Sequence, residues 1–323
     1  MARHLLALLL TGGIALGAPA ADASAQELSG TLKKVRDAGG IVLGYRDSSF
    51  PFSYLAPGQS RIAAAGEPCE EAAPRREGTA QPACVLGYSI DLCREVVDEL
   101  SAELGGMPIR VRYRRVTPED RIPLLVAGEI DLECGSTTNN RARQREVAFS
   151  PVIFVTGTKL LVRRADAIRS YLDLRSKSIV VTAGTSNEAA MQRLNERQRL
   201  GWQILTPPDH EQSFQMFMQG RADAFAMDDI LLSGFVARSR AGDRLAMVGD
   251  FLSYDPYGLM HRKDDPAFAA VVDRTFAQLA ETRRIRQIYG RWFLERLPTG
   301  ERLGLPMTPQ LEAIFHTLGL PEE

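Results

Sequence analysis

The chain has 323 residues, of which 39 are basic and 40 acidic, and its formal net charge is −1. A chain this close to neutral lacks the broad positive field that holds nucleic acid, so we expect no nucleic-acid partner. Beyond the N-terminus, no window approaches the roughly 20 apolar residues of a membrane-spanning helix.

The first 25 residues are ordered like a signal peptide. A basic start at 1–4 precedes an apolar stretch at 5–16, and the small-residue step Ala23-Ser24-Ala25 follows. The alternative, a short buried helix, is disfavoured by the helix breakers Gly17 and Pro19. We expect cleavage after Ala25 and export of a soluble chain to the periplasm. About 300 residues then remain, enough for two lobes of ordinary domain size.

Strand and helix patterns alternate along the exported chain. In chain order they predict a strand at 41–45, a helix at 90–100, a strand at 109–113, a helix at 121–127, strands at 130–134, 159–162 and 178–182, helices at 188–199 and 211–219, a strand at 222–227, and helices at 266–281 and 285–294. This alternation is typical of βαβ units, so we predict an α/β fold with mainly parallel sheets.

Four cysteines lie in the exported part. Cys69 and Cys84 flank the polar segment 70–83, which has no apolar periodicity, and a disulfide between them would close it. Closing a loop of about 15 residues contributes roughly 3 kcal/mol in the chain-entropy model. Cys93 lies on a predicted helix and Cys134 at the end of a predicted strand, and the sequence leaves open whether they pair or stay as buried thiols.

No motif for a metal, a cofactor or a catalytic reaction is present. His210, His261 and His316 are far apart, and no Cys-x-x-Cys or Cys/His spacing of a zinc site occurs. No nucleophile–base pair or phosphate-binding glycine loop stands out. We therefore expect a protein without metal or cofactor that is not an enzyme.

Short polar segments follow the predicted strands, where α/β sheets bind ligands. They are residues 46–49, 135–140, 184–187 and 228–229. Two of them run straight into predicted helices, where hydroxyl side chains can cap the helix and leave backbone N–H groups free to hold an anion. Arg143, expected on the first turn of one such helix, can clamp a carboxylate with two hydrogen bonds. Ordinary helix capping is the alternative.

Several blocks of sequence resemble the polar amino-acid-binding proteins of ABC importers (solute-binding protein family 3). They are GYRDSSFPFSY at 44–54, GYSIDL at 87–92, RIPLL at 121–125, DLECGSTTNNRARQ at 131–144, DHEQSF at 209–214 and AFAMDD at 224–229. The block at 131–144, with Arg143, is the most specific, and it resembles the glutamate/aspartate-binding branch. The likeness runs in order along nearly the whole exported chain.

The resemblance implies a periplasmic-binding-protein clamshell of type II, with two lobes joined by two hinge strands. Residues 26–153 and 254–323 would form lobe 1, and residues 154–253 would form lobe 2. The lobes would close on the ligand, and the permease subunits of an importer in the membrane would recognise the closed form. We expect a monomer.

The resemblance also assigns residues to the common part of an amino acid. Arg143 would bind the α-carboxylate, with hydrogen bonds from Thr138 and Thr185. Asp228 would pair with the α-ammonium group, helped by Ser136.

Three further residues would hold the side chain of the ligand. Arg46 and Arg121 would meet an acidic side chain, and His210 would close the pocket from the other lobe. Three arginines for two carboxylates indicate an acidic ligand, because a neutral side chain would leave two buried guanidinium groups without a partner. We therefore expect glutamate or aspartate.

The chain departs from the glutamate/aspartate branch in two places. Pro118 stands where that branch carries a serine, so one hydroxyl and one N–H are lost near Arg121. The segment 59–86 is longer than the usual hairpin of the family.

Two other functions are compatible with the same scaffold. One is a sensor subunit for an acidic amino acid that a membrane signalling partner reads. The other is a dehydratase-type enzyme, for which Glu133, Glu188 and Glu211 are the candidate general acids. Nothing in the sequence singles out one of these three carboxyl groups.

Overall fold

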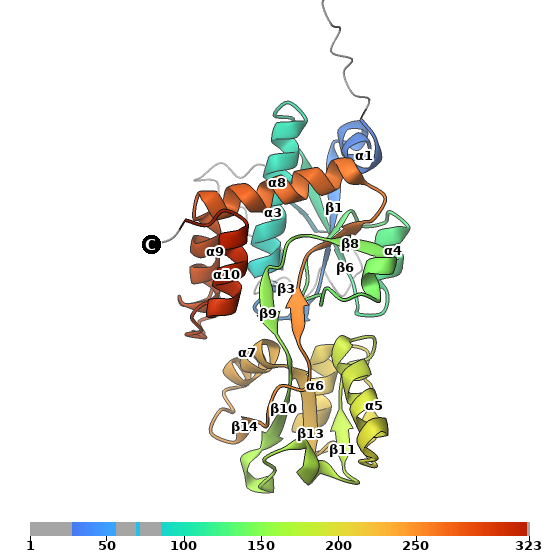
Figure 1. Cartoon of the computed structure of the whole chain (residues 1–323), viewed down its shortest axis with the longest axis vertical. Coiled ribbons are helices and arrows are strands. Elements are labelled where there is room, and N and C mark those ends of the chain that lie inside the picture. Colours follow the sequence, from blue (N-terminus) through green and yellow to red (C-terminus); the bar gives the residue numbers. More distant parts are fainter. Residues whose placement is uncertain (1–27, 56–68, 72–84, 322–323) are drawn as a thin grey trace, which may run out of the picture.

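A computed structural model describes residues 28–55, 69–71 and 85–321, which form two lobes along the long axis of the molecule (Figure 1). The predicted signal peptide lies outside the described residues. So does Cys84, and with it the predicted disulfide to Cys69. Within the described part of the chain, no helix combines the length and the apolar character needed to cross a membrane.

The upper lobe in Figure 1, lobe 1, is built on a six-stranded sheet of order β4-β6-β1-β7-β16-β8. The strands are β4 (Cys69–Glu71), β6 (Arg110–Arg115), β1 (Gly40–Tyr45), β7 (Leu132–Glu133), β16 (Met260–Arg262) and β8 (Val147–Phe149). The central strands β6, β1 and β7 are parallel, and the outer strands pair antiparallel. The sheet therefore has a parallel centre, as the βαβ pattern predicts.

The helices of lobe 1 come from both ends of the chain. They are α1 (Gly30–Ala38), α3 (Tyr88–Glu103), α4 (Arg121–Val126), α8 (Pro266–Glu281), α9 (Arg284–Phe293) and α10 (Pro309–Thr317). The Asp265 side chain accepts a hydrogen bond from the Phe268 N–H, and Pro266 stands in the first turn, so this sequence starts α8. α8 packs against α1 and α3, so the C-terminal part completes lobe 1 (Figure 1).

A small sheet and an aromatic cluster lie at the lower end of lobe 1. The sheet consists of β2 (Ser48–Ser49), β3 (Ser53–Leu55) and β5 (Val85–Leu86). Phe52, which lies between β2 and β3, is fully buried and makes edge-to-face contacts with Tyr88, Phe154 and Tyr257. This cluster anchors the strands that leave lobe 1.

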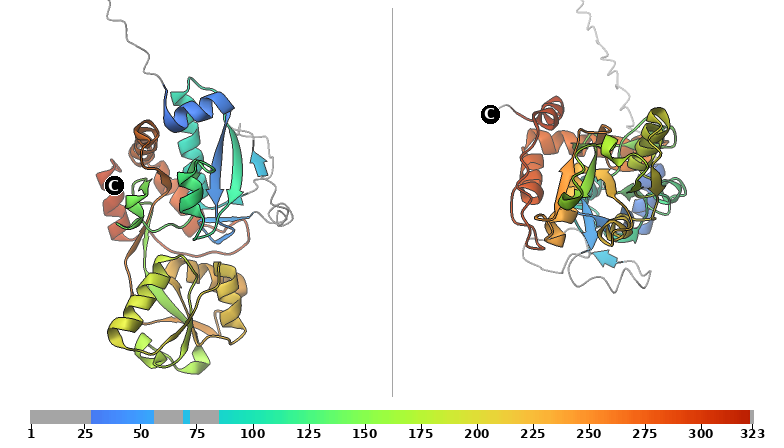
Figure 2. Two further views of the ribbon diagram at one scale, coloured as in Figure 1. Left: turned by 90° about the vertical axis from the view of Figure 1, so that its right-hand side faces the viewer. Right: turned by 90° about the horizontal axis from the view of Figure 1, so that it is seen from below.

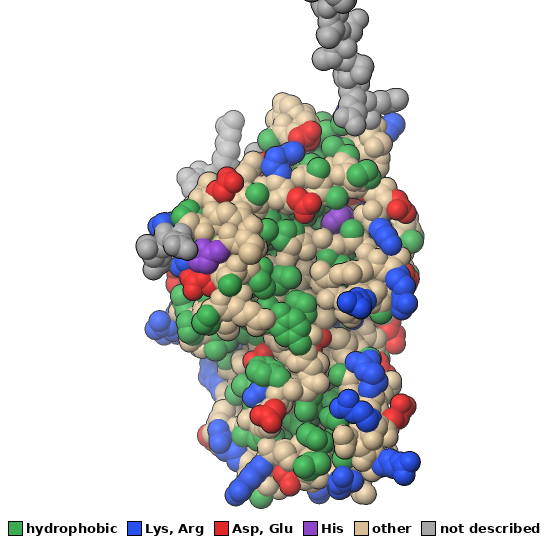
Figure 3. All heavy atoms as spheres, viewed as in Figure 1, with side chains coloured by type: hydrophobic (Ala, Val, Ile, Leu, Met, Phe, Trp, Pro, Cys, Tyr) green, Lys and Arg blue, Asp and Glu red, His purple; other side chains and the backbone are tan. Residues whose placement is uncertain are grey.

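Lobe 2 is a five-stranded sheet of order β12-β11-β13-β10-β14 with helices around it. Its strands are β12 (Gln203–Leu205), β11 (Ser178–Val180), β13 (Ala224–Asp228), β10 (Thr158–Arg163) and β14 (Leu245–Val248), and its helices are α5 (Ser186–Gln198), α6 (His210–Met218) and α7 (Asp229–Ser239). β12, β11 and β13 are parallel. In Figure 3, basic side chains gather over α5, which exposes Arg193 and Arg197.

Two short strands connect the lobes, as the left panel of Figure 2 also shows. β9 (Phe154–Thr156) leads into lobe 2 and β15 (Asp255–Tyr257) leads back. They pair antiparallel, with Asp255 opposite Thr156 and Tyr257 opposite Phe154. Two α/β lobes on a paired connection can change their angle without unfolding either sheet.

Candidate ligand-binding site

The structure gathers seven of the eight predicted site residues around one small cavity between the lobes. The lining consists of Arg46, Arg121, Ser136 and Thr138 from lobe 1 and Thr185, Ser186, Asn187, His210, Asp228 and Leu231 from lobe 2. Each predicted residue in the lining lies at or after the end of a strand or at the start of a helix, so the carboxyl ends of the parallel strands of both sheets meet at this cavity. Of the eight, Arg143 is absent from the lining.

Arg46 and Arg121 are nearly inaccessible to solvent, with 1% and 2% of their surface exposed. Arg46 follows β1, and Arg121 is the first residue of α4, where the helix dipole disfavours a cation. Nη2 of Arg46 and Nε of Arg121 have no hydrogen-bond partner among the described residues. Burial and the charge of Arg121 lower the pKa of Arg46, but a guanidinium stays charged at neutral pH. The two groups therefore present unpaired donors and positive charge to the cavity.

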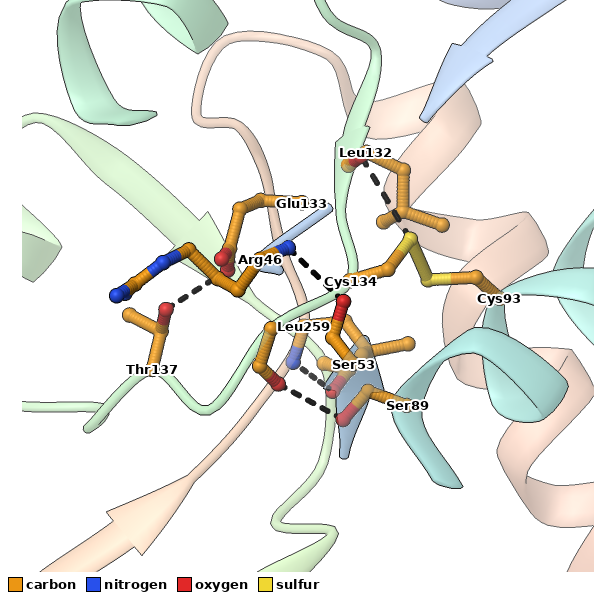
Figure 4. The surroundings of a disulfide bond; sticks show 11 residues. Arg46, Ser53, Ser89, Cys93, Leu132, Glu133, Cys134, Thr137 and Leu259 are labelled. Atoms are coloured by element: carbon orange, nitrogen blue, oxygen red, sulfur yellow. Dashed lines mark hydrogen bonds between the residues drawn. A yellow bond between two sulfur atoms is a disulfide. The ribbon is translucent and has the colours of Figure 1, made fainter. Parts of the chain in front are cut away.

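A buried carboxylate stands behind these arginines. Glu133 is fully buried at the end of β7, and its Oε2 accepts a hydrogen bond of 2.8 Å from the Thr137 hydroxyl, which in turn accepts one from Arg121. Figure 4 shows Glu133, Thr137 and Arg46 together. A Cβ at Gly135 would lie 2.3 Å from Oε1 of Glu133 and 2.9 Å from Cγ of Arg46, so only glycine leaves room here. Glu133, a candidate acid in the sequence, is therefore placed as a buried counter-charge.

Arg143 lies immediately behind the cavity wall. Its Nη1 donates to the Thr138 carbonyl at 2.8 Å, and its backbone N–H donates to the Asn140 side chain at 3.0 Å. Arg143 begins a 3-10 turn, Arg143–Arg145. The prediction that it lies on the first turn of an α-helix is therefore wrong. Burial, followed by the charge of Arg121, lowers the pKa of Arg143. The shared electrostatics place Arg143 in the same charged cluster as Arg121.

The turn before α5 combines capping with a contact between the lobes. Thr185 is the N-cap of α5, and its Oγ1 accepts from the Glu188 N–H at 3.1 Å, so the ordinary capping interpretation is correct for its side chain. The next residue, Ser186, forms a hydrogen bond of 2.9 Å with the Thr138 hydroxyl across the cleft. Thr185 also lines the cavity, so one turn serves both the helix and the site.

Asp228 lies at the end of β13 and is 3% exposed. It accepts hydrogen bonds from the Asn187 amide at 2.7 Å and from the Tyr257 hydroxyl. Burial, together with the nearby charge of Asp255, raises its pKa to about 7. Its neighbour Asp229, at the start of α7, instead accepts a hydrogen bond from the Thr156 hydroxyl. Asp228 is therefore the carboxylate that the cavity offers to a cation.

His210 is the first residue of α6 and is 3% exposed. Its Nδ1 lies 2.9 Å from the Thr182 hydroxyl. Burial, and then the charges of Arg46 and Arg121, hold its pKa well below the usual range, so the ring is neutral at neutral pH. It closes the lobe 2 side of the cavity.

A disulfide between Cys93 and Cys134 lies next to the site, which settles the pairing that the sequence leaves open. It ties α3 to the segment that carries Ser136 and Thr138 (Figure 4 shows the disulfide, with Ser89 nearby). The Ser89 hydroxyl donates a hydrogen bond of 2.7 Å to the Gly135 carbonyl. Both contacts fix this segment to the body of lobe 1.

Sequence reasoning missed two partners of Asp228. Asn187 belongs to a polar turn that the sequence singles out, but nothing in the turn indicates a contact with β13. Tyr257 lies on a three-residue strand with no pattern of its own. Among the described residues, no group of three or more His, Cys, Asp or Glu side chains is placed to hold a metal ion.

The fold and the site define a two-lobed solute-binding protein. The model of the family "bacterial extracellular solute-binding proteins, family 3" matches residues 78–295, and the chain belongs to this family. The resemblance drawn from the sequence blocks is thereby confirmed.

Curated relatives match nearly the whole chain. The L-glutamate/L-aspartate-binding protein of Pseudomonas aeruginosa is 39% identical over 95% of this chain and 94% of the relative. The glutamate/aspartate import solute-binding protein of Escherichia coli is 36% identical, over 97% of this chain and 95% of the relative. These relatives are named as binding proteins, which confirms a binding protein rather than an enzyme on this scaffold.

The fold also matches solved structures. An ancestral arginine-binding protein bound to arginine superposes with a TM-score of 0.63 and 22% identity, over 79% of this chain and 98% of that chain. The predicted two-lobed clamshell is therefore confirmed.

Proposed function

We propose that the chain binds glutamate or aspartate in the periplasm and delivers it to the permease subunits of an ABC importer. The names of the relatives support this ligand, and the word "import" in one of them supports a transport role over a sensor. A signal peptide cleaved after Ala25 provides the export step. The lobes comprise residues 26–153 with 254–323 and residues 154–253.

One observation carries the choice of ligand: the charge of the cavity lining. In the ligand-free lining Arg46 and Arg121 contribute two positive charges and His210 is neutral, so the sum is +1 once Asp228 is ionised, as pairing with an α-ammonium group requires. Behind the lining, Arg143 and Glu133 have opposite charges. Glutamate and aspartate have two carboxylates and one ammonium group, which sum to −1. A ligand of this class brings the one net negative charge that offsets the ligand-free lining.

The common part of the amino acid has a matching set of groups. Asp228 accepts the α-ammonium group, with Ser136 beside it. The α-carboxylate accepts hydrogen bonds from the guanidinium of Arg143 and from the hydroxyls of Thr138 and Thr185. For Arg143 this requires that the guanidinium turns from the Thr138 carbonyl toward the ligand.

Arg46, Arg121 and His210 select the acidic side chain. A neutral side chain would leave both guanidinium groups buried without an anion, and an unpaired buried charge costs about 3–5 kcal/mol. Pro118 lies against the turn at Gly184 of lobe 2. It thus affects the lobe contact near Arg121 rather than the charge balance.

A thermal-shift screen across the amino acids, followed by calorimetry, tests this function. Glutamate or aspartate should raise the melting temperature, and arginine should not. Arg143→Ala should abolish binding of every amino acid, whereas Arg121→Ala should mainly lose the preference for acids, by about 100-fold or more. Arg221→Ala, an exposed arginine of lobe 2, is the matched control. Equal thermal shifts for all amino acids would refute the proposal.

A further inference from the structure

A chain of hydrogen bonds behind His210 fixes which ring nitrogen is protonated. Nδ1 of His210 lies 2.9 Å from the Thr182 hydroxyl, and that hydroxyl lies 2.9 Å from the Ser213 hydroxyl. The Ser213 hydroxyl in turn donates to the Asp209 carbonyl at 2.9 Å. All three side chains are buried within lobe 2.

The direction of this chain follows from its last member, because a carbonyl oxygen can only accept. The Ser213 proton points to Asp209, so Ser213 must accept from Thr182. The Thr182 proton is then used, and Thr182 must accept from Nδ1–H of His210. The reverse direction would leave the Ser213 oxygen facing the carbonyl oxygen without a proton between them. The neutral ring therefore has its proton on Nδ1 and none on Nε2.

Nε2 is the ring nitrogen of His210 that remains available to a ligand. Nε2 has no hydrogen-bond partner among the residues that the structure describes. It is also not among the unpartnered polar atoms that are fully shielded from solvent, so some of its surface stays accessible. Since His210 lines the cavity, we infer that Nε2 is the ring atom that meets the side chain of a bound ligand. A bare Nε2 is a hydrogen-bond acceptor.

The charges around the ring explain why it stays neutral without a ligand. The nearby charged groups are Arg46 and Arg121 across the cavity, Asp228 at the end of β13, Asp209 and Glu211 beside His210 in the sequence, and Arg115, whose guanidinium is 4.0 Å from Asp209. Burial and the two cavity arginines dominate and hold the His210 pKa well below its usual range.

We propose that an acidic ligand binds with uptake of one proton at Nε2 of His210, whereas an amide ligand binds without it. This inference rests on the proposed function. A ligand carboxylate brings a second acceptor to Nε2, so one proton from solvent must come between them, giving an imidazolium–carboxylate pair. The Nδ1–H bond to Thr182 stays intact during this step. A side-chain amide donates its own N–H to the bare Nε2.

The consequence is a selectivity that depends on pH. The preference for glutamate over glutamine should fall by up to about tenfold per pH unit as pH rises from the pKa of His210 in the free protein toward its higher pKa in the glutamate complex, and it should level off above the latter, as one linked proton requires. Asp228 must be ionised for any α-ammonium group, so its titration affects both ligands equally. The ratio of the two affinities therefore isolates His210.

Calorimetry in two buffers with different ionisation enthalpies measures the proton count directly. At pH 7, the wild type should take up about one proton more per glutamate than per glutamine. Thr182→Val should remove this uptake while keeping His210, because the ring can then place its proton on Nε2. Thr182→Ser, which keeps the hydroxyl, is the matched control and should retain the uptake.

The outcomes separate the two proposals. Equal proton counts for glutamate in the wild type and in Thr182→Val, or for glutamate and glutamine in the wild type, would overturn the proton linkage and leave the proposed function intact. A chain that binds neither glutamate nor aspartate at any pH would refute the proposed function. Each of the two comparisons, between ligands and between variants, decides the linkage by itself.

Discussion

Gly234 of α7 packs against Phe50 across the junction of the lobes. A Cβ at position 234 would lie 2.7 Å from the Phe50 carbonyl oxygen and 2.9 Å from its ring. One turn further along the helix, the guanidinium of Arg238 lies 5.5 Å from the centre of the same ring. Phe50 belongs to lobe 1 and α7 to lobe 2, so the absence of a side chain at 234 lets the lobes approach.

Replacing Gly234 with valine should therefore hinder closure and weaken ligand binding. Overpacking of a tight contact costs about 1–3 kcal/mol, which corresponds to roughly 5- to 150-fold in affinity. Calorimetry gives the affinity, and small-angle X-ray scattering with saturating glutamate reports closure. Gly290→Ala is the control, because a Cβ at that helical glycine meets no atom within 4 Å. Wild-type affinity in Gly234→Val would show that this contact does not limit closure.

Asp228→Asn should stabilise the ligand-free protein at high pH and abolish binding. The folded pKa of Asp228 is raised from 3.8 to about 7, so between these values the folded chain holds a proton that the unfolded chain has lost. The free energy of unfolding therefore falls as pH rises through this window, by up to roughly 4 kcal/mol. Asparagine removes this cost, so its advantage should be full near pH 8 and absent near pH 4.

Urea denaturation of the wild type and Asp228→Asn at several pH values, without amino acids, measures this difference. If the free energy of unfolding of Asp228→Asn exceeds that of the wild type by the same amount at pH 5 and pH 8, the buried carboxylate is not the origin of the difference. Added glutamate should stabilise the wild type but not the variant, because only an ionised Asp228 pairs with the α-ammonium group.

The sequence predicts the longer elements well because their signals are local. The helix predicted at 266–281 has the bounds of α8, since a capping aspartate, a proline in the first turn and apolar periodicity all agree. The prediction omits α1 (Gly30–Ala38) and α10 (Pro309–Thr317). The connecting strands β9 and β15 have three residues each, too few for a periodic pattern, and only their pairing with each other defines them.

In the candidate site, too, some residues can be predicted from local sequence signals and others cannot. The residues that follow strands, such as Arg46, Ser136 and Asp228, can be found by asking what lies at the carboxyl ends of a parallel sheet. The position of Glu133 behind the cavity and the role of Thr182 behind His210 cannot, because both depend on contacts between segments far apart in the chain. The pairing of Cys93 with Cys134 is of the same kind.

Removing the Cys93–Cys134 disulfide should destabilise lobe 1 and loosen the site. The cysteines are 41 residues apart in sequence, for which the chain-entropy model gives about 4 kcal/mol. The double variant Cys93→Ala, Cys134→Ala removes this bond alone, whereas a reducing agent would act on any disulfide of the chain. Urea denaturation should show a lower midpoint, and calorimetry a weaker affinity for glutamate. An unchanged midpoint would mean that packing alone fixes this segment.

Gly135→Ala tests whether space around Glu133 sets the position of Arg46. Gly135 has no positive φ, so alanine is compatible with the backbone, and only the 2.3 Å approach to Glu133 and the 2.9 Å approach to Arg46 oppose it. Because the new methyl group must displace one of these side chains, we expect the free energy of glutamate binding to become less favourable by about 1–3 kcal/mol. Gly242→Ala is the matched control, since its nearest neighbour, Val236, lies at an ordinary 3.6 Å. If Gly135→Ala binds glutamate as tightly as Gly242→Ala does, Arg46 is not held in place from this side.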